Sequence, residues 1–227
     1  MKRIVQPELL DRLPPHDPRA VRSRRDLRRV NAWMGNHSIM ADALQRMVHP
    51  QPPNQITELG TGDGNFLLRV AEKITVRWPE VKAVLLDRQR IATRETLAAF
   101  NALNWHAEAM VVDVFDWPQT DSDIVIANLF LHHFADAQLA ELLQLISRRT
   151  KLFIALEPRR GFWPLFCSRW LWAIGCNEVT CFDAEVSVRA GFCGDELSRL
   201  WPDRQGWRFT ELSAGAFSHL FVARKIG

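Results

Sequence analysis

Cysteine is scarce in this chain of 227 residues, and its four cysteines are not spaced as metal ligands. They follow one another irregularly without a Cys-x-x-Cys pair, and the neighbouring histidines are not at ligand spacing, so a zinc site is excluded. Free, buried thiols in a reducing compartment are expected instead. The sequence therefore predicts no metal ion and a cytoplasmic location for a chain with Cys167, Cys176, Cys181 and Cys193.

Long hydrophobic runs are also missing. No stretch approaches the roughly 18 consecutive apolar residues that cross a membrane, and the N-terminus lacks the apolar core of a signal peptide. Internal repeats and low-complexity tracts are absent as well. A hydrophobic fraction of 47% is ordinary for a globular protein. One large domain, or one domain with a cap, is expected, without a transmembrane segment.

Positive charge is concentrated near the N-terminus. Residues 1–50 contain ten Lys and Arg against five Asp and Glu, a local balance of +5 within a chain of net charge +3. Three interpretations stand: a solvated helix face, a site for an anionic ligand group, or a nucleic-acid contact. No nucleic-acid-binding module is visible, so no nucleic-acid partner is expected. The excess is mainly due to Arg19, Arg22, Arg24, Arg25, Arg28 and Arg29.

The first 53 residues have the pattern of a helical cap. Residues 1–22 are rich in proline and are expected to be irregular. A short helix is predicted over Asp26–Met34, and Ser38 is expected to cap a second helix that ends at Pro50.

Strand and helix patterns alternate from residue 54 onward. Apolar runs such as Ala83–Leu86 and Ile124–Ala127 are typical of parallel strands that are covered on both faces. The alternation predicts an α/β fold with a doubly wound, mostly parallel, Rossmann-like sheet, whose ligands bind at the carboxyl ends of the strands. Two last β-prone runs predict an antiparallel C-terminal hairpin. Strands are expected at 55–60, 81–87, 107–114, 123–128, 151–157, 207–212 and 217–224, and helices at 64–78, 92–101, 135–149 and 195–201.

The pattern breaks at about residues 158–194, which are predicted to be a substrate lid inserted into a main domain of residues 54–227. The stretch Phe162–Trp172 is dense in aromatic residues. It is expected to line an apolar pocket, but core packing, an oligomer contact within a homodimer and a patch on a membrane surface are alternatives.

The stretch Glu58–Asn65 reads Glu-Leu-Gly-Thr-Gly-Asp-Gly-Asn and lies between a predicted strand and a predicted helix. Glycines at such a turn let the backbone approach a ligand, and the N–H groups of the helix N-terminus face it. A dinucleotide site would have a third glycine where Asn65 stands, which disfavours a nicotinamide-dependent reductase. Glu58 suits a ligand with a cationic group.

The sequence of this loop resembles the first motif of the class I S-adenosylmethionine-dependent methyltransferases. Later positions match the family in order: Asp87 closes the second strand, Asp113 closes the third, and the fourth runs into Ala127–Phe134. The resemblance covers roughly residues 54–225. It implies the corresponding fold and S-adenosylmethionine as cofactor.

The resemblance also assigns roles at matching positions. Asp87 would accept hydrogen bonds from both ribose hydroxyls, and Asp113 would accept one from the adenine amino group. Glu58 would bind the methionine ammonium group, or alternatively would only accept hydrogen bonds from the loop amides. Arg88 would lie on the adenine face or in solvent, and Arg25 or Arg28 would reach the methionine carboxylate or remain on the surface. The expected cofactor-binding residues are Glu58, Gly60, Thr61, Gly62, Asp87, Arg88, Asp113, Val114 and Asn128.

His132 and His133 follow the fourth strand at the ligand end of the sheet. A neutral imidazole removes a proton near pH 7, so either histidine is a candidate general base. Positioning of cofactor or substrate, and a purely structural role, are the alternatives.

The expected function is methyl transfer to a small organic molecule, at the oxygen of an aromatic or polyketide-like acceptor in natural-product biosynthesis. Two alternatives remain: methylation of protein or RNA, for which no recognition domain is visible, and a non-catalytic partner subunit with the same fold.

Overall fold

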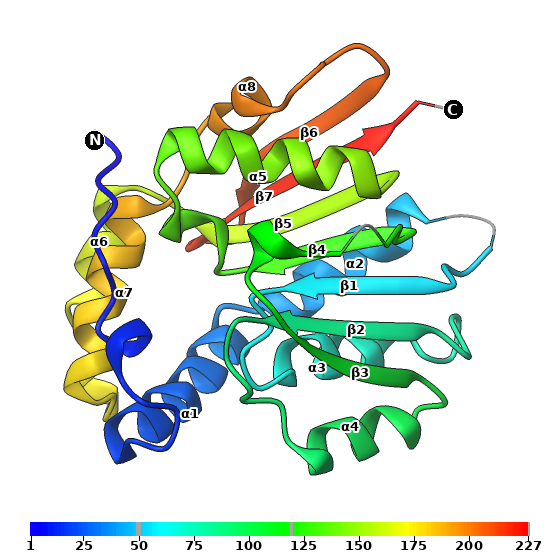
Figure 1. Ribbon diagram of the computed structural model, residues 1–227. Coiled ribbons are helices and arrows are strands. Elements are labelled where there is room, and N and C mark those ends of the chain that lie inside the picture. The colour runs from blue at the N-terminus through cyan, green and yellow to red at the C-terminus, as the bar shows by residue number, and fades with distance from the viewer. Residues whose placement is uncertain (49–50, 119, 227) are drawn as a thin grey trace.

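The centre of the computed structural model, which describes residues 1–48, 51–118 and 120–226, is a seven-stranded sheet between two layers of helices (Figure 1). The strands lie in the order β3-β2-β1-β4-β5-β7-β6, and β7 runs in the opposite direction to the others. The strands are β1 (Gln55–Leu59), β2 (Lys82–Asp87), β3 (His106–Val111), β4 (Ile124–Asn128), β5 (Leu152–Pro158), β6 (Trp207–Ala214) and β7 (Ser218–Lys225).

This order confirms the predicted doubly wound α/β sheet and its C-terminal hairpin. The first strand pairs in parallel with both β2 and β4, so the strand order reverses at β1. A crevice opens outside the carboxyl ends of the strands at such a reversal, and ligands bind there. The fold therefore places the ends of β1, β2 and β4 around one site.

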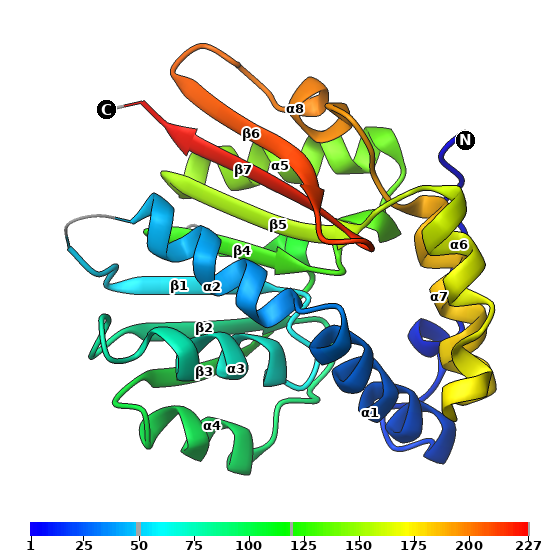
Figure 2. The same ribbon diagram turned by 180° about the vertical axis from the view of Figure 1, so that it is seen from behind.

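Both faces of the sheet are covered. The helices α2 (Asn36–Met47), α3 (Asn65–Ile74) and α4 (Arg94–Asn101) lie on one face (Figure 2), while α5 (Asp136–Arg149) and α8 (Glu196–Leu200) lie on the other (Figure 1). All residues of β4 and β5 are buried, which explains why these strands are apolar except near their carboxyl ends, where Asn128 and Glu157 stand. Each face has its own hydrophobic cluster, one around Leu67 and Phe100 and the other around Leu143 and Phe153.

Each of the two N-terminal helices begins at a different residue from the one predicted. The first, α1, spans Pro18–Trp33, because Asp17 caps it and a proline is well tolerated at the first helical position. The second begins at Asn36 behind Gly35 rather than at a Ser38 cap. Its expected end, Pro50, lies outside the described residues, as does Gly227 at the end of the predicted main domain.

The segment after β5 is helical, which the sequence analysis did not anticipate. It forms α6 (Phe162–Ser168), the 3₁₀ turn η4 (Leu171–Ile174) and α7 (Glu178–Ala190). Asn177 caps α7 by accepting a hydrogen bond from the backbone N–H of Thr180. The other short 3₁₀ turns are η1 (Leu10–Arg12), η2 (Val114–Asp116) and η3 (Leu131–His133).

The cysteines of the chain are free thiols, as expected, but only Cys176 among them is buried. Within the described residues, no helix is both long and apolar enough to cross a membrane. The division into a cap and a main domain stays a prediction, although Met40 and Leu44 of α2 belong to the core beneath the sheet.

Candidate functional site

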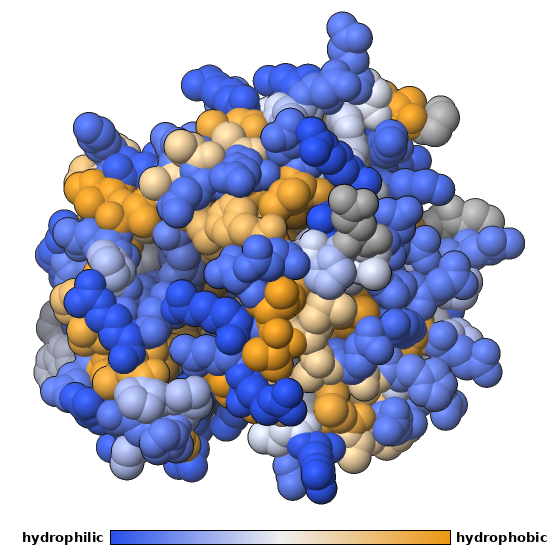
Figure 3. Space-filling view, viewed as in Figure 1, coloured by the Kyte–Doolittle hydropathy of each residue, from blue (hydrophilic) through white to orange (hydrophobic). Residues whose placement is uncertain are grey.

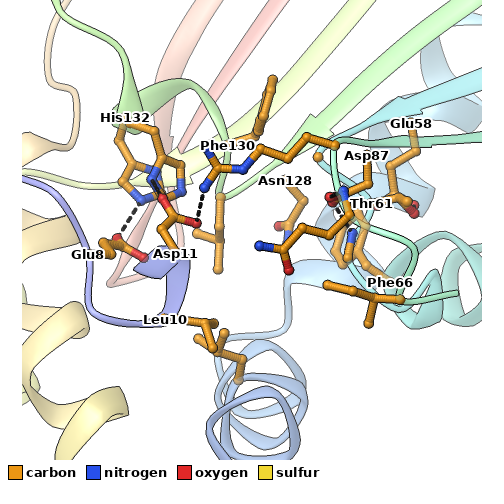
Figure 4. Close-up of a pocket in the computed structure, with 18 of the residues that line it drawn as sticks. Glu8, Leu10, Asp11, Glu58, Thr61, Phe66, Asp87, Asn128, Phe130 and His132 are labelled. Atoms are coloured by element: carbon orange, nitrogen blue, oxygen red, sulfur yellow. Dashed lines mark hydrogen bonds and ion pairs between the residues drawn. The ribbon is translucent and has the colours of Figure 1, made fainter. Parts of the chain in front are cut away.

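A cavity of about 650 Å³ opens at the carboxyl ends of the strands, between the sheet, α1 and the N-terminal segment. Figure 4 shows side chains from these elements converging on it. Residues from the ends of β1, β2, β3 and β4 line this one cavity. All eleven residues that the sequence analysis proposed for the site are among them: Glu58, Gly60, Thr61, Gly62, Asp87, Arg88, Asp113, Val114, Asn128, His132 and His133.

The glycine loop is shaped by positive backbone angles. Gly60 has φ of 65°, and a Cβ atom there would lie 2.2 Å from a ring carbon of Phe130, so only glycine fits. Gly62 has φ of 57° and faces open space. The backbone N–H of Thr61 donates to the carbonyl oxygen of Leu86 at 3.1 Å, which fastens the loop to β2. The loop therefore brings its backbone to the edge of the cavity.

Asp87 and Asp113 are held by backbone N–H groups. One carboxylate oxygen of Asp87 accepts from Gly62 and the other from Gln89, both at 2.8 Å. Asp113 lies two residues beyond β3, rather than closing it, and accepts from Phe115 at 3.0 Å. Each oxygen has more than one lone pair, so both carboxylates can still accept hydrogen bonds from a ligand in the cavity.

Glu58 is a buried acid at the end of β1. The hydroxyl of Thr61 donates to its carboxylate at 2.6 Å. Burial raises the pKa of Glu58 to about 8, against the opposing effect of the hydrogen bond from Thr61. Glu58 is thus mostly neutral at pH 7, and a cation placed beside it would favour its ionised form.

Asn128 joins the sheet to the N-terminal helices. Its amide donates to Asn31 of α1 at 3.2 Å, and its carbonyl oxygen accepts from Asn36 of α2 at 3.3 Å. Asn36 in turn accepts from the hydroxyl of Ser218 at 2.7 Å. All four side chains are buried, so this network fixes α1 and α2 against the ends of β4 and β7.

Glu157 at the end of β5 organises the turn that carries the histidines. Its fully buried carboxylate accepts from the backbone N–H groups of Phe130, Leu131 and His132, at 3.0, 2.8 and 3.3 Å. It also contacts Nδ1 of His132 at 2.8 Å. The preceding Leu129 has φ of 52°, a strained conformation for a side-chain-bearing residue, which these hydrogen bonds maintain.

His132 lies between two carboxylates. Its Nε2 is 3.1 Å from Glu8 of the N-terminal segment, and its Nδ1 faces Glu157 (Figure 4). Burial alone would lower the pKa of His132, but the hydrogen bonds to Glu157 and Glu8 outweigh it and raise the pKa to about 9. Burial likewise opposes ionisation of Glu8, yet the histidine charges and the hydrogen bond from His132 lower its pKa to about 2. His132 is therefore a charged imidazolium.

This state favours a positioning role for His132 over the predicted general-base role, because both ring nitrogens then carry protons donated to carboxylates. The role of His132 stays a prediction. Glu8, His132 and His133 offer ligand atoms within 4.8 Å of one another, a spacing that also suits a metal ion. A metal ion bound there would have to displace a proton from the imidazolium of His132. The sequence analysis did not identify Glu8 or Glu157 as site residues. For Glu157, its position as an acid at the end of β5 was the one signal that could have revealed it.

His133 differs from its neighbour. The two rings have centroids 4.3 Å apart, and Nδ1 of His133 is 3.4 Å from a carboxylate oxygen of Asp11. Burial and then the charge of His132 lower the pKa of His133. Two adjacent imidazoles do not both carry a charge easily, so the charge on His132 favours the neutral form of His133.

Ion pairs connect the two sides of the cavity mouth. Arg28 of α1 pairs with Asp63 of the glycine loop, and Arg88 pairs with Asp11 at 3.2 Å. Both pairs are partly exposed, so each contributes little stability. Arg28 lines the cavity, whereas Arg25 lines a separate groove.

The aromatic stretch does not line this cavity, contrary to the first expectation. Among the described residues of the predicted lid, 158–194, Ser187 is the one that reaches the cavity. The aromatic side chains of Phe162–Trp172 point to solvent instead, so they are not core either.

Comparison with known proteins agrees with this geometry. A family model described as a methyltransferase domain matches residues 56–152. Uncharacterised methyltransferases of Mycobacterium tuberculosis and Mycobacterium bovis are 30% identical over 137 residues, which are 57% of this chain and 66% of theirs. The match thus spans just under two thirds of the length of these relatives.

Two solved structures share the fold. A plantazolicin methyltransferase in complex with SAH has a TM-score of 0.67 at 12% identity, covering 92% of this chain and 91% of its own. The mitomycin 7-O-methyltransferase has a TM-score of 0.61 at 19% identity, covering 95% and 60%. The fold class predicted from the sequence agrees with both.

Proposed function

Since this chain belongs to the class I S-adenosylmethionine-dependent methyltransferases, with S-adenosylmethionine as methyl donor, we propose that it methylates a small organic molecule, at an oxygen atom of an aromatic or polyketide-like acceptor. The observation that carries the proposal is the single cavity onto which all eleven predicted residues converge.

The residues present fit this cofactor. The buried acid Glu58 lies where a cationic group would restore its charge, and Asp87 offers hydrogen-bond acceptors at the end of β2. Open space at Gly62 lets a ligand approach the loop backbone closely. When bound, S-adenosylmethionine supplies an electrophilic methyl group on a sulfonium.

The remaining work falls to side chains of this chain. Alignment of an acceptor with the methyl group supplies several kcal/mol of barrier reduction. We assign proton removal from the acceptor to His133, because the orientation of its Nδ1 toward Asp11 leaves the lone pair on Nε2. His132 is a positioning residue, which ties Glu8 and the N-terminal segment to the turn after β4.

Several features support a small acceptor. The cavity is bounded by the protein's own N-terminal segment, through Glu8, Leu10 and Asp11. The mitomycin enzyme, of similar fold, is named for a methylated oxygen. Methylation of protein or RNA, and a non-catalytic role, remain the alternatives.

Titration with S-adenosylmethionine, followed by transfer of a labelled methyl group to fractionated cell extract, tests the proposal. Label in the small-molecule fraction is expected, whereas label confined to macromolecules, or binding without transfer, contradicts it. His133→Ala is expected to lower turnover about 100-fold or more with cofactor affinity unchanged, since general-base catalysis contributes about 10²–10⁴. Full activity of this variant would exclude the assigned role.

A further inference from the structure

Six large hydrophobic side chains of α6, η4 and the short link between them face solvent, each between 52% and 83% exposed. Figure 3 shows hydrophobic residues reaching the surface at the left edge of the view, where Figure 1 shows α6 and α7. Scattered exposed hydrophobic residues are normal, but a cluster of this kind marks an interaction site. This aromatic face consists of Phe162, Trp163, Phe166, Trp170, Trp172 and Ile174.

The aromatic face is continuous. Ring centroids are 6.0 Å apart between Trp163 and Phe166, 6.1 Å between Phe166 and Trp170, and 5.9 Å between Trp170 and Trp172. The opposite side of the segment, including Leu171, is buried against the protein. The rings are therefore displayed on an anchored support.

Positive charge borders the aromatic face on the side of α1. Residues 161–175 contain a single charged side chain, Arg169, and it is paired with Glu185 of α7 at 3.1 Å. Arginines of α1 border η4, because Arg22 donates to the carbonyl oxygen of Gly175 at 3.3 Å and Arg29 to that of Ile174 at 3.1 Å. Six arginines and one aspartate are the charged residues of α1.

These arginines also form a groove of about 550 Å³ beside the aromatic face, lined by Arg22, Arg25, Arg29, His16 and Gly175. Its acid, Asp26, is buried, accepts from the backbone N–H of Asn177 and pairs with Arg29 at 3.3 Å. Arg25 has no ion-pair partner within the described residues. The groove thus presents a net positive charge to the outside.

We propose that the aromatic face and the arginines of α1 together dock the protein on the surface of a bilayer containing anionic lipids. Tryptophan and phenylalanine rings suit the membrane–water interface, and arginine side chains are attracted by lipid phosphates. A second copy of the chain is a poorer occupant, since a symmetric contact would bring two basic borders together.

The docking surface lies on the outer side of the helical layer that also bounds the cavity. α6 packs on α7, and α7 contributes Ser187 to the cavity on its inner side. The layer that carries the aromatic face is therefore also part of the cavity wall. The docking surface does not depend on the proposed chemistry, so either proposal can fail alone.

Co-sedimentation with vesicles tests this inference. The wild-type chain is expected to bind vesicles of phosphatidylcholine with phosphatidylglycerol more strongly than vesicles of phosphatidylcholine alone. Phe166→Ser with Trp170→Ser is expected to reduce binding to both kinds of vesicle about 10-fold or more. Val76→Ser, at an exposed site just after the C-terminal end of α3, is expected to leave binding unchanged. Circular dichroism of each variant checks that it is folded.

The arginines are tested with a charge-matched pair of variants. Arg22→Gln with Arg25→Gln is expected to reduce binding several-fold to the anionic vesicles only, whereas Arg94→Gln with Arg148→Gln, exposed on α4 and α5, removes the same charge without effect. A wild-type chain that stays in the supernatant, or a folded variant with both Phe166→Ser and Trp170→Ser that binds like wild type, would overturn the proposal. So would light scattering that shows a dimer abolished by the serine substitutions, because a second copy would then occupy the aromatic face.

Discussion

The polar side chains at the two ends of the cavity differ in what they bond to. At the glycine loop, backbone N–H groups hold Asp87 and Asp113, and both side chains retain access to the cavity. At the histidine turn, His132 and Glu157 are buried and bond to one another, and their other polar atoms bond to Glu8 and to backbone N–H groups of the turn. The first end is arranged to receive a ligand, while at the second end His132 and Glu157 hold together the turn that brings His133 to the cavity.

The largest effect is expected at the histidine turn. His132→Ala would leave the carboxylates of Glu8 and Glu157 buried without their shared cation, and breaking a buried ion pair in this way costs roughly 3–5 kcal/mol. Denaturant unfolding measures the loss. His133→Ala, next in the chain and less buried, is the matched control and should cost far less. Equal losses in the two variants would remove the distinction between the histidines.

The same ion pairs give the stability a pH dependence. The pKa of His132 is raised from 6.5 to about 9, so its contribution is complete below pH 6.5 and is lost as the pH rises through 9. The pKa of Glu8 is lowered from 4.5 to about 2, so its contribution is lost as the pH falls from 4.5 toward 2. A His132→Ala variant should lack the alkaline loss.

These two ends also differ in how far the sequence reveals them. The glycine loop and Asp87 lie on consecutive strand ends, so their motif spacing predicts a shared site. Glu8 is 124 residues from its partner His132, and no local pattern signals that pairing. The central strands were also predicted closely, because their apolar runs reflect burial on both faces of the sheet.

The aromatic residues of α6 misled the sequence analysis. A high density of aromatic residues usually indicates a buried core or a pocket. Whether each ring is buried depends, however, on which side of the helix faces the protein, and the density alone does not show this. Pro18 misled it as well, because a proline interrupts a helix interior but starts α1 here.

Gly60→Ala is expected to have the next largest effect and probes the loop end. The added Cβ meets the ring of Phe130 at 2.2 Å, and a positive φ is unfavourable for alanine, for a combined loss of roughly 2–4 kcal/mol in unfolding free energy. Gly62→Ala has the same kind of φ but open space, so it should reduce cofactor affinity with a smaller loss of stability. Equal losses of stability would show that the approach to Phe130 is not what requires glycine.

Asp87→Ala tests whether the loop end receives the ligand. Loss of hydrogen bonds to the ribose is expected to weaken S-adenosylmethionine binding by about 1–3 kcal/mol, measured by calorimetric titration. The substitution also removes the acceptor for the N–H of Gly62, so Asp87→Asn, which keeps one acceptor oxygen, separates the two effects. Unchanged affinity in the alanine variant would mean that this carboxylate does not contact the cofactor.

The smallest signal, proton release from Glu58, is the most specific test of the comparison. Burial raises the pKa of Glu58 to about 8, so the acid is mostly protonated at pH 7, and a ligand ammonium beside it would lower that pKa again. Calorimetry in buffers of different ionisation enthalpy should detect close to one proton released per cofactor bound at pH 7, and almost none above pH 9, where the acid is already ionised. Glu58→Gln, which keeps the shape and cannot ionise, should bind without releasing the proton. If wild type and this variant release protons equally, Glu58 is a structural link to Thr61 rather than a partner of the ligand. Glu58 would then resemble Glu157, a buried acid that bonds only within the protein.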